Sequence, residues 1–284
     1  MGKVGLVLEG GAMRGMFTAG VTDVLMENNI RFDIAVGVSA GALFGCNYKS
    51  GQIGRAIRYN KRFCKDWRYS SFKSLIKTGD YYGADFCYNE LPNKLDYFDV
   101  KTYRENSMPF FIVASDCNTG KPVYKELNTC DANELTWMRA SASMPLASRV
   151  VKVDGYELLD GGITDSIPLQ YFESRGYSKN LVVLTQPRDY YKKQNKLIWL
   201  MKIMLKKYPN IVQAMKNRAK VYNQEKDYVF EQEKLGKAFV ICPENDLQIS
   251  RTEKNPEELQ RVYDLGRKVM QEKMEDFLKF HSIK

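Results

Sequence analysis

The sequence predicts an α/β fold, a three-layer α/β/α sandwich in which helices cover both faces of a mainly parallel sheet. Two observations support this prediction. The first fifty residues alternate twice between a short apolar run and a stretch with helical spacing, the pattern of parallel strands joined by right-handed crossovers. A later apolar run, "KNLVVLTQP" at residues 179–187, is typical of another buried parallel strand.

The amino-terminal elements follow from this alternation. Strands are predicted at "KVGLVLEGG" (residues 3–11) and "FDIAVGVS" (residues 32–39). The first is followed by a helical stretch over 12–29 and the second by one over 40–51, both with apolar residues three and four positions apart. A basic, aromatic helical region then extends to about Lys77 and leads into the loop-rich "TGDYYGADF".

The middle of the chain contains hairpin signals. "MPFFIVASDCNTGKPVYKEL" predicts two strands around an N-T-G turn, and "VVKVDGYELLDGG" predicts two strands around a D-G turn. Between them, "ANELTWMRASASMP" predicts a short helix that ends at a proline.

The carboxy-terminal part is predominantly helical. A long basic helical pattern covers residues 192–237, "AFVICPEN" predicts a last strand, and an amphipathic helix begins at N-cap Asn255 with Pro256 in its first turn. We therefore predict a catalytic domain over residues 1–190 and a basic helical extension over 191–284, packed on the core.

Composition excludes several classes of protein. Hydrophobic residues make up 44% and charged residues 27% of the 284 positions, which is ordinary for a globular chain. The amino-terminal apolar run is too short for a secretion signal, and no segment approaches the ~20 apolar residues that span a bilayer. Six scattered cysteines and one histidine make a zinc site improbable. We predict a metal-free cytoplasmic protein with reduced thiols.

The net charge of +9 is concentrated in two segments. The segment from Arg188 to Lys220 holds ten Lys or Arg and one acid, and the segment from Arg55 to Lys77 holds eight and one. Such concentration favours an anionic partner, either phospholipid headgroups or nucleic acid. Two solvated helix faces would show the same charge pattern.

A first motif is the glycine-flanked serine Gly37-Val38-Ser39-Ala40-Gly41. The bare pattern G-x-S-x-G is weak, but here a β-branched strand turns directly into a helix, which is the setting of a nucleophile elbow. Gly37 and Gly41 would allow the tight turn, and Ser39 would lie near a helix N-terminus that favours negative charge. The alternative is a serine N-cap between small packing residues.

A second motif is the glycine loop Glu9-Gly10-Gly11-Ala12-Met13-Arg14-Gly15, between the first strand and the first helix. Such a loop leaves main-chain N–H groups free to bind an anion. The loop could also bind a dinucleotide, but the G-x-G-x-x-G motif of such sites would have its middle glycine at Ala12, and it is missing here. The neighbouring Ser39 favours an oxyanion hole over residues 10–15, in which Arg14 braces the loop or steers a phosphate.

A third motif is Asp160-Gly161-Gly162 at the end of a predicted strand. In isolation it would be an ordinary turn. Together the three motifs supply a nucleophile, an oxyanion hole and a carboxylate at strand-end loops of one sheet. The only histidine, His281, lies in the charged tail and is interpreted as a solvated terminal residue rather than a triad base. Asp116 and Asp165 are interpreted as turn residues.

With these three motifs in this order, residues 3–190 resemble the patatin-like phospholipase family. The stretches "ASDCNTGKPVY" and "RASASMPLASRVVKVDGYELLDGG" resemble it too, whereas the tail beyond about Lys192 resembles bacterial members only weakly. The family loop often has a third glycine where this chain has Ala12, and alanine suits the loop if its φ is negative.

The resemblance implies a patatin-like fold and a Ser-Asp dyad, with Ser39 as nucleophile and Asp160 as base. It implies a phospholipase or esterase that forms an acyl-serine intermediate and needs no cofactor or metal. For Asp160 to act as a base, its pKa should be raised, or the oxyanion hole must carry much of the barrier. The alternatives are an acyltransferase or thioesterase with the same dyad, and a non-catalytic nucleotide- or membrane-binding protein.

A lipid ester substrate has to be taken from a surface, and one basic stretch fits that task. Lysines of residues 190–222 alternate with the apolar residues Leu197, Ile198, Trp199, Leu200, Met201, Ile203, Met204 and Leu205. This pattern is typical of an interfacial amphipathic helix, and also of a helix packed on the core. We predict peripheral contact with an anionic membrane at the inner face and no nucleic-acid partner, since no recognition module accompanies the charge. The sequence leaves the oligomeric state open.

Overall fold

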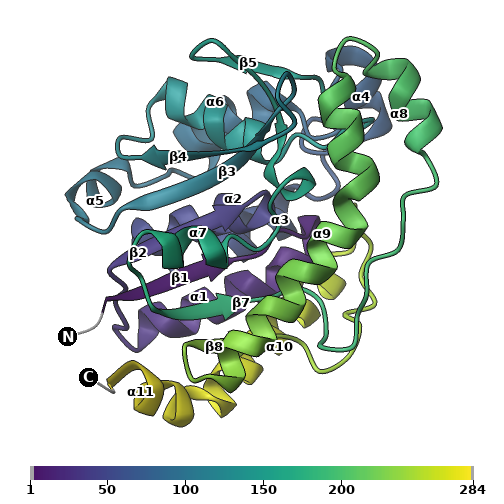
Figure 1. Ribbon diagram of the computed structural model, residues 1–284. Helices are drawn as coiled ribbons and strands as arrows, with labels where there is room; N and C mark the ends of the chain where they lie inside the picture. The colour runs from purple at the N-terminus through teal and green to yellow at the C-terminus, as the bar shows by residue number, and fades with distance from the viewer. Residues whose placement is uncertain (1–2, 283–284) are drawn as a thin grey trace.

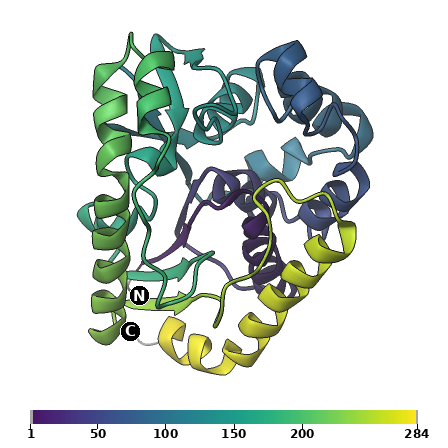
Figure 2. The same cartoon turned by 90° about the vertical axis from the view of Figure 1, so that its right-hand side faces the viewer.

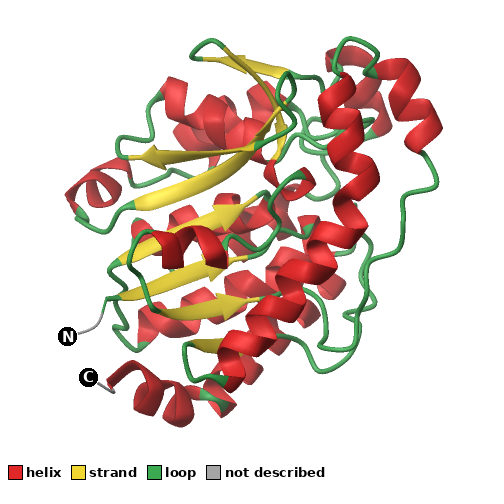
Figure 3. Cartoon of the chain, viewed as in Figure 1, coloured by secondary structure: helices red, strands yellow, loops and turns green. Residues whose placement is uncertain are grey.

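A computed structural model describes residues 3–282 and contains a single sheet with helices on both faces (Figure 1). Its strands, shown in Figure 3, are β1 (Val4–Leu8), β2 (Ile34–Val38), β3 (Phe110–Asp116), β4 (Pro122–Leu127), β5 (Val151–Val153), β6 (Tyr156–Asp160), β7 (Lys179–Val183) and β8 (Ala238–Ile241).

The α-helices connect and cover these strands. They are α1 (Met16–Glu27), α2 (Ala40–Lys49), α3 (Arg55–Phe63), α4 (Phe72–Thr78), α5 (Val100–Glu105), α6 (Ala132–Ser141), α7 (Leu169–Ser174), α8 (Ile198–Met204), α9 (Pro209–Lys234), α10 (Pro256–Glu272) and α11 (Met274–Ser282). Two short 3-10 turns, η1 (Ala12–Gly15) and η3 (Gly161–Ile163), lie at strand ends, and η2 (Phe86–Leu95) is a π-helix.

The strand order is β5-β6-β3-β2-β1-β7-β8, with β4 paired to β3. The strands β3, β2, β1, β7 and β8 are mutually parallel, whereas β4, β5 and β6 pair antiparallel. The predicted α/β class and mainly parallel sheet are therefore confirmed, and both predicted hairpins form. Two of the antiparallel pairs are these hairpins, β3–β4 across residues 117–121 and β5–β6 across Asp154 and Gly155, because connections this short cannot join parallel strands.

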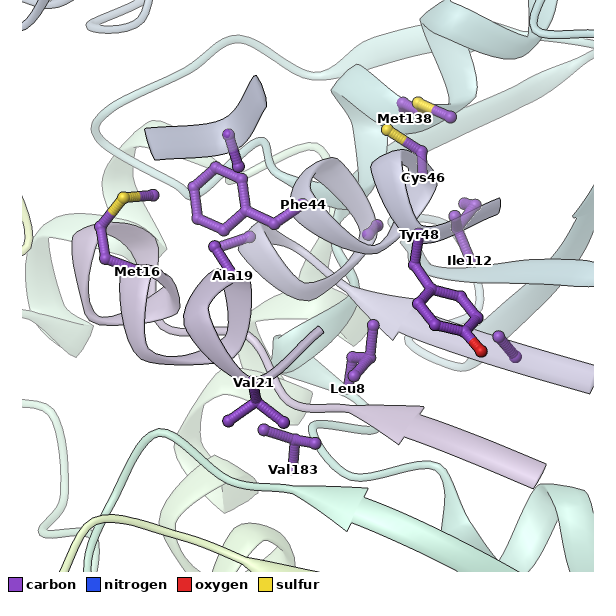
Figure 4. Close-up of a cluster of buried hydrophobic side chains, with 14 of the residues drawn as sticks. Leu8, Met16, Ala19, Val21, Phe44, Cys46, Tyr48, Ile112, Met138 and Val183 are labelled. Atoms are coloured by element: carbon purple, nitrogen blue, oxygen red, sulfur yellow. The ribbon is translucent and has the colours of Figure 1, made fainter. Parts of the chain in front are cut away.

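The two faces of the sheet bury different clusters because successive strand residues point in opposite directions. In β1, Leu6 and Leu8 pack toward α1 and α2, while Val7 packs toward α7 and α9. Figure 4 shows the first cluster, where Leu8 and Val183 of the sheet lie among side chains of α1 and α2. These two clusters form the interior of the predicted three-layer sandwich.

The carboxy-terminal part is built into the sandwich. Strand β8 pairs with β7, α9 crosses one face, and α10 packs against α1 on the other (Figures 1 and 2). The helix predicted to begin at Asn255 does so, since its side chain accepts from the N–H of Glu257 at 3.0 Å, and it divides at Lys273 into α10 and α11. The boundary after residue 190 stays a prediction.

The basic stretch predicted to be one long helix forms two, α8 and α9. Both interpretations of its apolar residues hold in part, because Met201 of α8 is buried while Trp199, Ile203 and Met204 are exposed. Within residues 3–282, no helix has both the length and the apolar character that crossing a membrane requires.

Two glycines set the distance between α1 and α10. A Cβ atom at Gly20 would lie 2.1 Å from the carbonyl oxygen of Tyr263, and one at Gly266 would lie 2.1 Å from that of Phe17. Both contacts are with main-chain atoms, so the helices would have to move apart to admit a methyl group.

We expect Gly266→Ala to lower the free energy of unfolding by about 1–3 kcal/mol, the usual cost of an overpacked interior site. Helix propensity alone predicts that alanine stabilises the helix more than glycine does. The expected loss of stability therefore runs against helix propensity. Urea denaturation followed by circular dichroism measures the change. Gln271→Ala, on an exposed position of the same helix, is the matched control. Equal stability of G266A and Q271A would contradict the close crossing.

Candidate active site

Ser39 lies at the turn between β2 and α2, in the strained backbone of a nucleophile elbow. Its φ of 54° and ψ of −121° are unusual for a residue with a side chain. The flanking glycines make the turn possible: a Cβ at Gly37 would lie 2.5 Å from the carbonyl oxygen of Gly41, and one at Gly41 would lie 2.4 Å from that of Leu8. The local geometry thus matches the predicted elbow rather than an ordinary serine N-cap, and the Ser39 side chain makes no capping hydrogen bond.

Strand pairing explains why Asp160 comes close to this turn. Strand β4 occupies one edge of β3 from Phe110 to Ser115. The other edge is therefore shared, by β2 up to Val113 and by β6 from Ala114 onward. Because β2 runs parallel and β6 antiparallel to β3, their carboxyl ends meet. Ser39 follows one end and Asp160 forms the other.

Asp160 is buried and only partly hydrogen-bonded. Its Oδ1 accepts from the N–H of Gly162 at 2.8 Å, while its Oδ2 has no partner of normal geometry within residues 3–282. Burial raises the pKa of Asp160, and the nearby Ser39 hydroxyl and the Arg218 charge partly oppose that rise in pKa. A carboxylate that acts as a base needs a raised pKa of this kind.

The two glycines after Asp160 hold this end of β6 against β3. A Cβ at Gly161 would lie 2.1 Å from the carbonyl oxygen of Val113, so only glycine fits there. The turn continues as η3, with Asp160 as its N-cap. The third motif is thus an element of the site and not an isolated turn.

Ser141, in the last turn of α6, is a buried residue that the motifs did not single out. Its hydroxyl donates to the carbonyl of Val113 at 2.6 Å and accepts from the main-chain N–H of Ser39 at 3.0 Å. It therefore links the elbow to β3 at the point where β2 and β6 meet. Its sequence signal is weak, because a serine at a helix end has many ordinary roles.

The glycine loop lies directly against the elbow. A Cβ at Gly10 would be 2.9 Å from the Cβ of Ser39, and one at Gly15 would be 2.7 Å from the Phe44 ring of α2. Among residues 3–282, the N–H groups of Gly10, Gly11 and Ala12 donate to no protein acceptor. Free N–H groups beside a serine are what an oxyanion hole requires, and Met13 is buried at the start of η1.

Ala12 has a left-handed main-chain conformation. Its φ is +51°, so the condition stated for an alanine in this loop, a negative φ, is not met. The loop turns sharply into η1 here, and a left-handed residue makes that turn, which explains why glycine would suit the position. The strain is borne by surrounding contacts, as at other functional sites.

Glu9 anchors the loop to two other elements. Its buried carboxylate accepts from the Thr185 N–H at 2.6 Å, just after β7, and from the Tyr222 hydroxyl of α9 at 2.8 Å. Thr185 Oγ1 also donates to the carbonyl of Gly10 at 2.9 Å. The sequence analysis gave no role to Tyr222 or Thr185, since neither belongs to a local pattern.

His281 lies far from Ser39 along the sheet. Its Nε2 is 3.1 Å from the carbonyl oxygen of Arg31, and its ring packs against Phe32 and Phe277. Arg31 precedes β2 while Ser39 follows it, so the whole strand separates the two, as Figure 1 shows for α11. A catalytic triad with His281 is excluded by this arrangement.

The other carboxylates have structural roles. Asp116 accepts from the Asn118 N–H and the Thr119 hydroxyl, as a turn residue does. Asp165 is more than a turn residue: it accepts from the Tyr124 hydroxyl at 2.6 Å and faces Glu225 of α9. Burial raises the pKa of both carboxyls, and for Glu225 the charge of Asp165 raises it further.

Ser39 opens into a cavity of about 1030 Å³, as large as the pockets that hold small-molecule ligands. Its wall is mainly apolar and comes from α2, the π-helix η2, the end of α6 and the segment around α8. Apolar lining residues include Leu43, Phe44, Tyr59, Tyr88, Leu91, Phe98, Met138, Met144, Leu146, Leu197 and Met201. A wall of this kind suits a long apolar group.

Within residues 3–282 no three His, Cys, Asp or Glu side chains gather as metal ligands, and no pair among the described cysteines forms a disulfide.

Comparison with known families identifies the chain. Residues 6–173 match the family model described as patatin-like phospholipase, which covers more than half of the sequence. The chain belongs to the patatin-like phospholipase family. The matched region includes Ser39, Asp160 and the glycine loop. Residues 208–282 match a second family model, a domain of unknown function named DUF6363. Most of the tail, which resembles patatin-like proteins only weakly, therefore matches a separate family model.

Named relatives share this family region. The Escherichia coli protein YjjU, described as uncharacterized, is 29% identical over 196 residues, covering 67% of this chain and 54% of that protein. Lysophospholipase nte1 of Aspergillus oryzae is 29% identical over 181 residues, covering 61% of this chain and 11% of that protein. A putative patatin-like phospholipase domain-containing protein of Caenorhabditis elegans, M110.7, is 26% identical over 185 residues, covering 61% and 16%.

The chain therefore spans about half, or much less, of the length of these relatives. Among solved structures, VipD from Legionella pneumophila aligns over 96% of this chain and 67% of its own, with a TM-score of 0.45 and 14% identity.

We expect Ser141→Ala to weaken the elbow of this patatin-like protein. The Ser39 N–H and the Val113 carbonyl each lose their hydroxyl partner, a loss of about 1–3 kcal/mol in stability for buried groups. Labelling of Ser39 by a fluorophosphonate should slow as well, measured at a temperature where every variant is folded.

Ser143→Ala is the matched control, because Ser143 is equally buried but its hydroxyl bonds only within its own helix end. Ser141→Thr should retain most of the labelling rate, since it keeps the hydroxyl. If S141A is labelled as fast as S143A, Ser141 does not position the nucleophile.

Proposed function

We propose that this protein is a serine-dependent lipid acyl hydrolase, a phospholipase or esterase that works through an acyl-Ser39 intermediate with Asp160 as its base. The observation that carries the proposal is the pairing of Ser39, in a strained elbow, with a buried carboxyl that lacks a second hydrogen-bond partner. Ser39 stands at the wall of a large, mainly apolar cavity. Family membership and relatives named lysophospholipase support it.

The reaction would proceed in two halves. Ser39 Oγ attacks the ester carbonyl carbon while its proton passes to Asp160, and the C–O bond to the alcohol then breaks as Asp160 returns that proton to the leaving oxygen. Water next attacks the acyl-serine and gives a proton to Asp160. The fatty acid leaves, and the proton returns to Ser39 Oγ.

The glycine loop would stabilise the negative charge that develops on the carbonyl oxygen. The free N–H groups of Gly10, Gly11 and Ala12 lie against Ser39, and one such donor is typically worth about 2.7–4 kcal/mol of transition-state stabilisation. Arg14 is turned toward the side-chain amide of Gln186, which supports a bracing role for its guanidinium. An apolar wall would hold the acyl chain and keep bulk water out.

We further propose that the protein takes its substrate from an anionic membrane. Exposed apolar side chains occur on two helices at one end of the molecule, Phe72 and Ile76 on α4 and Trp199 and Ile203 on α8 (Figures 1 and 2). The Phe72 ring packs on Tyr81, which lines the cavity. Lysines on both helices add attraction for acidic headgroups. A location at the inner membrane face stays a prediction.

We expect a fluorophosphonate probe to label the wild type and His281→Ala, and not Ser39→Ala. Asp160→Asn should reduce labelling by at least about a hundredfold, because an amide cannot take the serine proton. In the wild type, labelling should rise with pH as Asp160 loses its proton, at a pKa above the ordinary carboxyl value. Loss of labelling with H281A would contradict the dyad, and transfer of acyl label to an alcohol rather than water would favour an acyltransferase.

We expect the double variant Trp199→Ser/Ile203→Ser to bind vesicles of phosphatidylglycerol and phosphatidylcholine about tenfold more weakly or worse, because it removes apolar area that would enter the interface. Co-sedimentation measures the binding. Leu235→Ser is the matched control, an exposed apolar residue at the other end of α9, and Ser39→Ala should bind like the wild type. Equal loss for L235S, or no loss for the double variant, would contradict the proposed surface.

A further inference from the structure

Four basic side chains from distant segments gather beside the dyad. Arg14 comes from the glycine loop, Lys192 from the segment after β7, Arg218 from α9 and Arg251 from the segment before α10. Lys192, Arg218 and Arg251 line the same cavity as Ser39. Three of the four thus belong to the part of the chain beyond residue 190, outside the patatin-like match.

Arg218 places this cluster next to the reacting groups. Its guanidinium donates from Nε to the carbonyl of Gly162, two residues after Asp160. The charges of Arg218 and Arg251 both act to lower the pKa of Asp160. An anion held by these side chains would therefore lie within a short distance of an ester at Ser39.

The four cations lack acidic partners. Within residues 3–282 none of them comes within 4.0 Å of a carboxylate oxygen, whereas Arg55, on another part of the cavity wall, pairs with Asp96 at 3.3 Å. In the described part of the chain, the Gln186 amide is the only partner of the Arg14 terminal nitrogens, and the buried Nε of Arg14 has none. Asp189 and Asp246 also line the cavity but form no ion pair with the cluster.

The like charges of this cluster lower the pKa values of its members. Burial and the charges of Arg218, Arg251 and Arg14 together lower the pKa of Lys192 to about 7, against the opposing effect of Glu9. Burial and the charges of Arg14 and Arg218 likewise lower the pKa of Arg251. The Lys192 Nζ lies 3.9 Å from the centroid of the Tyr222 ring, a cation–π contact that partly stabilises its charge. A bound anion would relieve this repulsion.

We propose that Lys192, Arg218 and Arg251 form a headgroup site that binds the phosphate of the substrate lipid, so that the enzyme prefers esters with a net negative head. The inference rests on the proposed function and deepens it. Two guanidinium groups and an ammonium provide the donors that phosphate oxygens accept best. In a glycerol phospholipid the phosphate is a few bonds from the ester carbonyl, which matches a site beside Asp160, while the acyl chain fills the apolar part of the cavity.

The experiment compares two short-chain substrates, a monoacylglycerol 3-phosphate and the monoacylglycerol with the same chain, each as monomers so that no surface charge contributes. The wild type should show a kcat/KM at least about tenfold higher for the phosphate ester. Lys192→Gln/Arg251→Gln should lose most of this preference, with a much larger fall on the phosphate ester than on the uncharged ester, as expected when charge-assisted hydrogen bonds are removed. Lys234→Gln/Lys237→Gln, on exposed lysines outside the cavity, should behave as the wild type.

Inhibition by inorganic phosphate distinguishes a site for the phosphate of the substrate lipid from a site for a free phosphate ion. It should inhibit hydrolysis of the phosphate ester competitively in the wild type and not in K192Q/R251Q. If it instead accelerates hydrolysis of the uncharged ester, the cluster is an effector site and the headgroup proposal is wrong. Equal rates on both esters in the wild type, or an equal fall on both in K192Q/R251Q, would overturn it too.

If the protein is not a hydrolase, the same experiments give a different result from that expected if only the headgroup site is wrong. If neither ester is hydrolysed and the fluorophosphonate does not label Ser39, the hydrolase proposal fails. Calorimetry with inorganic phosphate then decides the cluster alone: binding by the wild type that is lost in K192Q/R251Q supports an anion site there, and no binding by the wild type removes it.

Discussion

The site depends on one feature of strand pairing: β2 and β6 meet head to head along a single edge of β3. Because the parallel partner β2 pairs with the earlier part of β3 and the antiparallel partner β6 with the later part, their carboxyl ends converge. That convergence brings Ser39 and Asp160 together although 121 positions separate them in the sequence. Gly161 and Ser141 complete the junction, one by giving space to the Val113 carbonyl and the other by bonding it.

The junction also determines the electrostatics of the dyad. Asp160 is enclosed by the sheet and η3, so desolvation dominates and its pKa is raised. One of its oxygens is held by the Gly162 N–H, which leaves the other as the acceptor for a proton. In the proposed dyad, which has no histidine, burial rather than a third residue would set the proton affinity of the carboxyl.

The carboxy-terminal part contributes to the site as well as to the fold. Strand β8 extends the sheet, and α9 supplies Tyr222 to the Glu9 carboxylate behind the glycine loop. The same helix supplies Arg218, and the segments around it supply Lys192 and Arg251. The residues proposed for catalysis lie within the patatin-like match, while the wall of the cavity is formed both by residues of that match and by residues beyond it.

The sequence by itself determined the α/β class, the strands and hairpins, the turn at Ser39 and the glycine loop, and it predicted Asp160 as the base. These features are local: periodicity, turn residues and glycine spacing record which backbone conformations each short stretch can adopt. Only the tertiary structure decided the positive φ of Ala12, the division of the basic stretch into α8 and α9, and the roles of Ser141, Thr185 and Tyr222. It also decided that Lys192, Arg218 and Arg251 line one cavity and that the Arg14 charge acts on Lys192, because residues from four distant segments become neighbours only through packing, which no local pattern records.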